Sequence, residues 1–168
     1  MNAENMTGKF KVVAVGGTFD SFHRGHRALL MKAFEVGKKV LIGLCTDKFA
    51  EKLRKPHKVA AYNERVKEIE TFLRDHKVRS RAKIIPISDS YGVTLSSSHL
   101  DAIVVSRETE SRAHEINEKR KSKGLSPLNI IVVEIVKAEN GTSISTTRIR
   151  RKEIDHDGRL LKPRSKKT

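Results

Sequence analysis

Five short runs rich in valine and isoleucine recur along the chain, and they constrain its fold more than any other feature. The runs span residues 12–15, 40–44, 84–87, 102–105 and 130–136. They lack the polar and apolar alternation of a half-exposed strand, as expected for parallel strands that are buried on both faces. Each gap leaves room for the crossover of a dozen or more residues that parallel strands need. The pattern predicts a single-domain α/β protein with a Rossmann-like, doubly wound, five-stranded parallel sheet.

Helical periodicity fills two of these gaps. The apolar positions are Leu29, Leu30, Ala33 and Phe34 in the first stripe and Val66, Ile69, Phe72 and Leu73 in the second. Apolar residues three or four apart lie on one face of a helix, so both helices are expected to pack on the sheet. We expect the first to begin near Gly25-His26 and to end at Gly37, where glycine tolerates a left-handed backbone. A polar helix over 111–123 is expected to face solvent.

The end of the chain differs in composition from the rest. Residues 148–168 carry nine Lys or Arg against three Asp or Glu, and the helical and strand periodicities stop near Asp155. Asp157-Gly158 is typical of a turn, and 163–168 is basic. The sequence therefore predicts a domain over residues 1–155, followed by a basic, mobile tail over 156–168.

The net charge points to anionic partners. Lys and Arg number 35 against 20 Asp and Glu, which leaves a formal charge of +15. A nucleic-acid-binding module would use such charge to neutralise phosphates, and it is the alternative function from another class. Aromatic residues make up only 5% of the chain, so platforms for stacking single-stranded bases are scarce and nucleic acid is the less favoured partner.

Other classes are disfavoured by what the sequence lacks. Cys45 is the only cysteine, which leaves no partner for an internal disulfide and no cysteine-based zinc cluster. No apolar run approaches the roughly 18 residues of a membrane span. The first ten residues lack the apolar stretch of a secretory signal. We expect no membrane partner and a cytoplasmic location, and the sequence leaves the oligomeric state open.

The loop after the first apolar run carries the main chemical motif. It reads Gly16-Gly17-Thr18-Phe19-Asp20-Ser21-Phe22-His23-Arg24-Gly25-His26. Loops at the carboxyl ends of parallel strands form the ligand crevice, glycines let a phosphate approach the backbone, and a helix start offers unpaired N–H groups. His23 and His26 lie three apart and so can donate to the same phosphoryl oxygens. Histidines at this spacing also occur by chance or as half of a metal site, but no third ligand lies nearby in the sequence.

A second motif opens the last short helix. It reads Asn140-Gly141-Thr142-Ser143-Ile144-Ser145-Thr146-Thr147-Arg148-Ile149-Arg150. Ser145 or Thr146 is expected to cap a helix that runs through Arg151. The hydroxyls of Ser145, Thr146 and Thr147 and the guanidinium of Arg148 suit the β- and γ-phosphates of a nucleotide, although an ordinary capped helix has the same composition. The chain contains neither a G-x-x-x-x-G-K-[ST] loop nor a G-x-G-x-x-G fingerprint.

These motifs resemble those of a known superfamily. The first is similar to the G-x-F-D-x-x-H-x-G-H signature of the nucleotidyltransferases, and the second resembles the I-S-S/T-T-x-x-R segment with which they grip ATP. Residues 59–65, 89–92 and 104–109 look like segments of the archaeal-type phosphopantetheine adenylyltransferases. The resemblance implies transfer of an adenylyl group from ATP, with Mg²⁺, to 4′-phosphopantetheine, which gives 3′-dephospho-coenzyme A and pyrophosphate without a covalent enzyme intermediate. Transfer to another phosphate acceptor, such as glycerol phosphate, FMN or NMN, is the alternative within the superfamily.

The resemblance also assigns roles by motif position. Thr18 would hydrogen bond the reacting phosphates, His26 would stabilise the transition state, and His23, which is often Thr or Asn in bacterial members, would assist. The expected ATP-binding residues are Gly16, Gly17, Phe19, Gly25, Arg107, Ser145, Thr146, Thr147 and Arg148. A phosphate-binding lysine is expected among Lys48, Lys52, Lys55 and Lys58, with Lys55 or Lys58 favoured. Asp89 and Tyr91 are expected to border the pantetheine pocket, although a turn would explain them equally well. No metal ligand is expected in the protein itself.

Overall fold

The computed structural model of the chain describes residues 8–162. Its five strands form one parallel sheet in the order β3-β2-β1-β4-β5. The strands are β1 (Phe10–Gly17), β2 (Gly37–Cys45), β3 (Ala82–Ile87), β4 (Ala102–Ser106) and β5 (Asn129–Val133). The predicted α/β fold with a five-stranded, doubly wound parallel sheet is therefore confirmed. β1 lies at the centre, where the strand order reverses.

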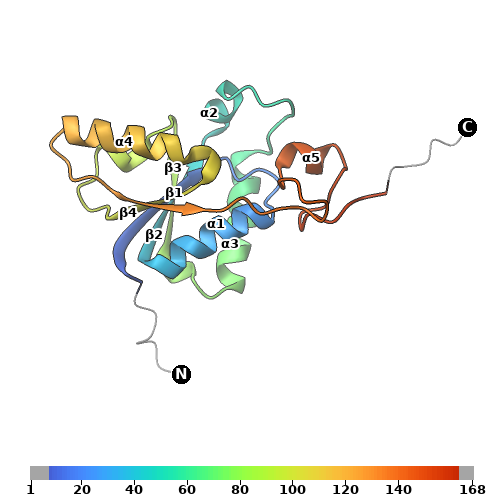
Figure 1. Cartoon of the computed structure of the whole chain (residues 1–168), viewed down its shortest axis with the longest axis horizontal. Helices are drawn as coiled ribbons and strands as arrows, with labels where there is room; N and C mark the ends of the chain where they lie inside the picture. Colours follow the sequence, from blue (N-terminus) through green and yellow to red (C-terminus); the bar gives the residue numbers. More distant parts are fainter. Residues whose placement is uncertain (1–7, 163–168) are drawn as a thin grey trace, which may run out of the picture.

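Five α-helices accompany these strands within the described residues. They are α1 (Arg24–Val36), α2 (Asp47–Lys52), α3 (Tyr62–Asp75), α4 (Glu110–Ser122) and α5 (Thr146–Arg150). Short 3₁₀ turns precede β3, follow β3 and lead into α4. Figure 1 shows α1 and α3 on one side of the sheet and α4 on the other, with α5 beyond the tip of β5.

Two apolar cores explain these layers. Val13, Ile42 and Val104 of the sheet pack with α1 and α3, through the two stripes that the sequence predicted. On the opposite face, Ala14 and Ile103 pack with α4. Neighbouring residues of β1 thus point into different cores, as the two-residue period of a strand requires. This is why the predicted strands read as continuous apolar runs.

The first helix differs from the prediction in its first residue and in the backbone conformation at its end. It begins at Arg24, with His23 as its N-cap, one residue earlier than predicted. It does end at Gly37, but the left-handed backbone predicted there is wrong, because Gly37 has φ −115° and ψ 141° and starts β2 directly. The glycine is needed for space, since a Cβ at this position would lie 2.5 Å from Cγ2 of Val13.

The last part of the described chain also differs from the prediction. β5 ends at Val133, before the predicted end at residue 136: Glu134 is exposed, and residues 134–136 pair with no neighbouring strand. The predicted cap of the last helix is Ser145, and Gly158 adopts the turn conformation with φ +82°. Residues 156–162, which we expected to belong to a mobile tail, hydrogen bond to the domain: the Arg24 amide donates to the His156 carbonyl at 2.9 Å. Residues 163–168 of the expected tail lie outside the described residues.

Candidate functional site

A cavity of about 480 Å³ opens at the carboxyl ends of the central strands. One part of its polar lining comes from the end of β1, the β1–α1 loop, α1 and the chain after α2: Gly16, Gly17, Thr18, His26 and Lys55. A second part comes from the chain after β3 and from the end of β4 to the start of α4: Ser90, Tyr91, Thr94, Ser106, Glu108, Thr109 and Arg112. Its apolar lining follows one face of the sheet and α4: Leu41, Ile85, Ile87, Val93, Ile103 and Ile116. Ala14 pairs with both Leu41 and Ile103 across the β1–β2 and β1–β4 ladders. The cavity therefore extends from the polar loop down one face of the sheet, at the point where ligands bind in open parallel sheets.

The β1–α1 loop (residues 18–23) is held in an uncommon backbone conformation. Phe19 and Ser21 have φ of +50° and +48°, in the left-handed region that non-glycine residues rarely occupy. The Phe19 ring is almost fully buried, and it compensates for this backbone by packing in the main core. A Cβ on Gly17 would lie 3.3 Å from that ring, whereas Gly16 is exposed and has only ordinary contacts. The buried Phe19 thus fixes the loop that borders the cavity.

The two histidines of the first motif stack on each other. Their ring centroids lie 3.7 Å apart, and the planes are 19° from parallel. The Gly25 amide donates to Nδ1 of His23 at 3.1 Å, and the His23 amide donates to Nδ1 of His26 at 3.3 Å. His26 lines the cavity, whereas His23 is buried beneath it and serves as the helix N-cap. The structure thus brings the histidines together, but only His26 borders the cavity.

This capping corrects the prediction of unpaired N–H groups at the start of α1. The Arg24 amide donates to the His156 carbonyl, and the Gly25 amide donates to His23. Gly25 itself is required by the stack, because a Cβ there would lie 2.9 Å from Cε1 of His23. The side chain of His26, rather than the first amides of α1, is therefore the donor that this helix offers.

Burial keeps both imidazoles neutral at neutral pH. It lowers the pKa of His23 to about 4, with smaller contributions from His156, Arg27 and Lys55. Burial also lowers the pKa of His26 well below its ordinary value, and His23 and Lys55 lower it further. A neutral imidazole whose Nδ1 accepts a hydrogen bond carries its proton on Nε2. His26 therefore offers a neutral Nε2–H donor.

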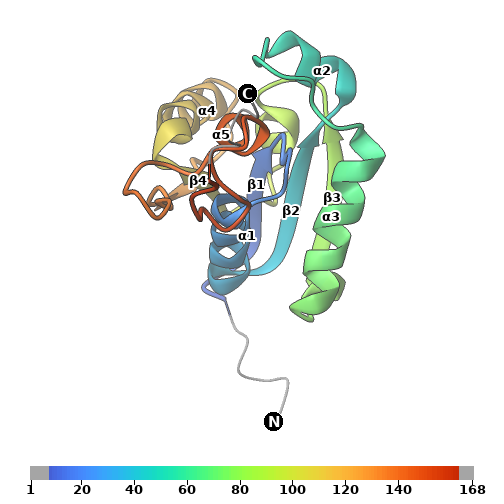
Figure 2. The ribbon, with the colours of Figure 1, turned by 90° about the vertical axis from the view of Figure 1, so that its right-hand side faces the viewer.

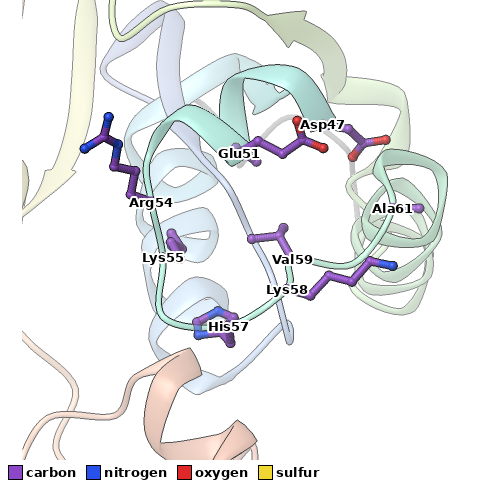
Figure 3. Close-up of a pocket in the computed structure, with 9 residues that line it drawn as sticks. Asp47, Glu51, Arg54, Lys55, His57, Lys58, Val59 and Ala61 are labelled. Carbon is purple, nitrogen blue, oxygen red and sulfur yellow. The ribbon is translucent and has the colours of Figure 1, made fainter.

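Lys55 is the lysine that joins this site. It lies on the segment that leaves α2, residues 53–61, which we call the lysine segment. A smaller cavity of about 280 Å³ lies between α2 and the lysine segment. Lys55 lines both cavities, whereas Lys58 lines only the smaller one. Figure 3 shows this smaller cavity, with Lys58 and Asp47 on its far side from Arg54. Neither Lys48 nor Lys52 lines either cavity. Of the predicted lysines, the structure places Lys55 with His26.

The second motif meets the first directly. Oγ1 of Thr146 donates to the Asp20 carbonyl at 2.8 Å, and Arg150 donates two hydrogen bonds to the Asp20 carboxylate. Ser145 caps α5 by accepting from the Arg148 amide at 3.3 Å. Figure 2 shows α5 and α2 at the same end of the molecule, near the carboxyl ends of the strands.

Arg148 is already engaged within the second motif. Its guanidinium donates to the hydroxyl of Thr142, to the Ser143 carbonyl at 2.9 Å and to Glu153 at 3.1 Å. Neither it nor Ser145, Thr146 or Thr147 lines the main cavity. In this structure, Arg148 therefore holds the loop that precedes α5.

Three other predicted residues lie around the site in different settings. Tyr91 lines the cavity, and its hydroxyl donates to Glu115 of α4. Asp89 does not line it; its carboxylate accepts the amides of Tyr91 and Gly92, both at 2.8 Å, as in an ordinary turn. Arg107 is 54% exposed and forms ion pairs with Glu110 and Glu134. Arg107 therefore does not line the cavity in this structure, although its neighbours Ser106 and Glu108 do.

Asp20, Arg65 and Arg150 are structural parts of the site that sequence reasoning missed. The Asp20 and Arg65 side chains are fully buried. Burial raises the pKa of Asp20, but the Arg150 hydrogen bonds and the Ala60 amide outweigh it and bring the net pKa below its ordinary value. The presence of Asp20 within the first motif was the available signal, but no local pattern indicates which distant residues it contacts.

A resident metal centre is not formed by the described residues. No group of three or more His, Cys, Asp or Glu side chains among residues 8–162 could hold a metal ion. The same residues include no helix long and apolar enough to cross a membrane.

Comparisons with known proteins agree with this fold and with both motifs. The family model described as cytidylyltransferase-like matches residues 14–152. The phosphopantetheine adenylyltransferase of Methanothermobacter thermautotrophicus is 45% identical over 157 residues, which cover 94% of this chain and 93% of that protein. The protein of the same name from Pyrococcus horikoshii is also 45% identical, over 94% of this chain and 99% of its own length. A solved structure of a protein of unknown function from Archaeoglobus fulgidus is 29% identical, with a TM-score of 0.66 over 79% of this chain and 98% of that one.

Proposed function

The chain belongs to the cytidylyltransferase-like family and, within it, to the phosphopantetheine adenylyltransferases, and from this premise we infer how its cavity serves the reaction. The enzyme transfers the adenylyl group of ATP to 4′-phosphopantetheine, a step of coenzyme A synthesis, and forms 3′-dephospho-coenzyme A and pyrophosphate. One observation carries the assignment of the cavity. Phosphate-binding groups and an apolar chamber line the same space, which suits a substrate with a phosphate at one end of a long neutral arm.

The polar lining receives the reacting phosphates in this proposal. An oxygen of the 4′-phosphate attacks the α-phosphorus, and the bond from that phosphorus to the bridging oxygen of the β-phosphate breaks, so pyrophosphate leaves. The 4′-phosphate is already an anion at neutral pH, so its attack requires no general base. The enzyme therefore contributes alignment, which can be worth roughly 7–11 kcal/mol, and stabilisation of the developing charge.

His26, Thr18 and Lys55 have distinct roles in this scheme. The neutral His26 Nε2–H donates to a non-bridging oxygen of the α-phosphate, where negative charge grows in the transition state. The Thr18 hydroxyl adds a neutral donor from the β1–α1 loop. Lys55 supplies a full positive charge from the other side of the cavity opening. His23 fixes the ring of His26 by stacking on it.

The second motif is proposed to hold the β- and γ-phosphates. Its contact with Asp20 places the start of α5 beside the β1–α1 loop, where Thr147 is partly exposed. Arg107 would have to leave Glu110 and Glu134 to reach the triphosphate, so we assign it a lesser part. Mg²⁺ enters as the ATP complex, with the phosphates as its main ligands. The cytoplasmic location stays a prediction.

A panel of phosphate acceptors tests the proposed function. The protein is mixed with ATP, Mg²⁺ and one of 4′-phosphopantetheine, glycerol phosphate, FMN or NMN, and released pyrophosphate is measured. We expect release with 4′-phosphopantetheine and formation of 3′-dephospho-coenzyme A. Release with another acceptor alone, from a folded preparation that binds ATP, would contradict the assignment.

A further inference from the structure

Asp20 is a buried carboxylate at the centre of the first motif, yet it does not line the main cavity. Its side chain has no exposure to solvent. Burying a carboxylate is costly unless charged partners and hydrogen bonds replace the water that it loses. The partners of Asp20 therefore indicate what its charge holds in place.

These partners come from two segments far away in the sequence. Oδ1 of Asp20 accepts the Ala60 amide at 2.9 Å, and both carboxylate oxygens accept from Arg150, at 2.9 and 3.0 Å. Nε2 of His57 lies 3.3 Å from Oδ2. Ala60 and His57 belong to the lysine segment, and Arg150 belongs to α5. One carboxylate thus links the β1–α1 loop to both segments.

The peptide of Ala60 is held from both sides. Its N–H donates to Asp20, and its carbonyl accepts Nε of Arg65 at 2.8 Å. Arg65 also donates to the Thr18 carbonyl at 2.9 Å and to the Cys45 carbonyl at 2.8 Å. Both groups that hold Ala60 are therefore tied to the same loop that supplies Thr18.

The rest of the lysine segment has few anchors of its own. It contains no helix or strand between the end of α2 and the start of α3, and no backbone hydrogen bond is donated by residues 55–59. After Lys55, the segment first meets Asp20 through the His57 ring and then through the Ala60 amide. The position of Lys55 at the cavity consequently depends on the end of α2 and on these contacts with Asp20, of which the Ala60 hydrogen bond is the one that holds the backbone.

We propose that Asp20 is a positioning residue, which fixes Lys55 through Ala60, and α5 through Arg150, relative to the β1–α1 loop. The proposal rests on the proposed function, because its effect is on how the two substrates are aligned. Small displacements of aligning groups can cost about 10²-fold in rate. A carboxylate that holds both the lysine segment and α5 is placed to cause such displacements when it is changed.

Two double-mutant cycles test this role. The first combines Asp20→Asn with Lys55→Met and measures kcat/KM for 4′-phosphopantetheine. Asp20→Asn alone is expected to lose about 10- to 100-fold. In the Lys55→Met background, the further loss of kcat/KM caused by Asp20→Asn is expected to be at least threefold smaller than in the wild-type background, because no lysine is left to be displaced. The second cycle combines Asp20→Asn with Arg150→Gln and measures KM for ATP. The rise in KM caused by Asp20→Asn is again expected to be at least threefold smaller in the Arg150→Gln background than in the wild-type background.

The controls separate positioning from folding. Glu70→Gln removes another carboxylate that pairs with arginines, Arg74 and Arg79, away from the main cavity, and is expected to leave the kinetics unchanged. Arg150→Lys keeps a cation for Asp20 and is expected to retain most of the activity that Arg150→Gln loses. If Asp20→Asn does not fold, this comparison of the two Arg150 variants tests the proposal in its place.

Either of two results would overturn the proposal. One is that the effects of the two single substitutions multiply fully in the double variants of both cycles. The other is that Arg150→Lys is no more active than Arg150→Gln. The wild-type enzyme is the reference for the reaction itself. Wild-type turnover with unchanged Asp20→Asn kinetics would reject the positioning role alone. Absence of wild-type turnover would reject the proposed function instead.

Discussion

At the scale of single residues, the spacing of the first motif has a steric and an electrostatic explanation. Gly25 leaves room for the His23 ring, which stacks on His26 and caps α1. The hydrogen bond from the His23 amide to Nδ1 of His26 directs the remaining proton of that ring to Nε2. His23 thus fixes the orientation and the protonated nitrogen of the His26 ring, and only His26 borders the cavity.

Replacing His26 by alanine tests its role as a transition-state donor. His26→Ala is expected to lower turnover by roughly 10²–10³-fold while ATP binds nearly as well, because the hydrogen bond strengthens only as charge develops. Turnover is measured by pyrophosphate release and ATP affinity by calorimetry. His23→Asn, which retains an acceptor for the Gly25 amide, is expected to lose much less. Near-normal turnover of His26→Ala would refute the assignment.

The low pKa of His23 predicts how stability depends on pH. Between pH 7 and 5 the unfolded chain, with an ordinary histidine pKa near 6.5, binds a proton that folded His23, with a pKa of about 4, does not. Stability is therefore lost as pH falls through this window, by about 2 kcal/mol from His23. Urea unfolding at both pH values measures the loss. His23→Asn should show a smaller pH dependence, and an equal one would contradict the prediction.

At the scale of elements, the accuracy of the sequence predictions follows from how each element is stabilised. The strands were predictable because burial on both faces demands apolar runs, and α1 and α3 because they pack one face on the sheet. α2 was missed because its six residues are too few to show a helical period. The N-cap at His23 was missed because histidine is not among the preferred capping residues.

The candidate site was predictable only where one segment contains it. The β1–α1 loop was found because its chemistry is local, and its position at the end of β1 follows from the sheet topology. The choice between Lys55 and Lys58 depends on the path of an irregular segment, which no periodicity describes. The partners of Asp20 and the pairing of Arg107 with Glu134 depend on contacts between residues far apart in sequence, which no local pattern indicates.

Two lysine variants test the path of the lysine segment. Lys55→Met is expected to lower kcat/KM by at least tenfold, because the charge that it removes lies at the main cavity. Lys58→Met is expected to stay within about twofold, since Lys58 lines only the smaller cavity and not the main one. Both variants remove one charge from the same segment and so control for each other. The reverse order of losses would show that Lys58 is the phosphate ligand.

At the scale of the whole molecule, residues 156–162 join the end of the described chain to the start of α1. The amide of Glu139 donates to the Gly158 carbonyl at 2.8 Å, the Arg24 amide donates to the His156 carbonyl, and Arg27 pairs with Asp157. These contacts link the helix of the first motif to the loop of the second. Residues 156–162 thus contact both motif-bearing parts of the chain.

Two truncations measure this contribution. A chain that ends at Asp155 loses five backbone hydrogen bonds. Two of them, from the amides of Arg24 and Glu139, tie residues 156–162 to distant parts of the domain, and each is worth about 0.5–1.5 kcal/mol. Its melting temperature is expected to fall by roughly 5 °C relative to a chain that ends at Lys162, at about 2–4 °C per kcal/mol. Comparing the two truncations cancels the effect of residues 163–168. Equal melting temperatures would show that residues 156–162 do not stabilise the domain.

The central claim is that the adenylyl group passes directly from ATP to the 4′-phosphate, with both substrates in one cleft and no covalent enzyme adduct. ATP with sulfur in place of one non-bridging α-oxygen makes the α-phosphorus chiral, so the product reports the stereochemical course. A single in-line attack by the 4′-phosphate inverts that centre, and the account predicts inversion in 3′-dephospho-coenzyme A. Retention would require two successive displacements through an adenylylated enzyme, and it would contradict the account.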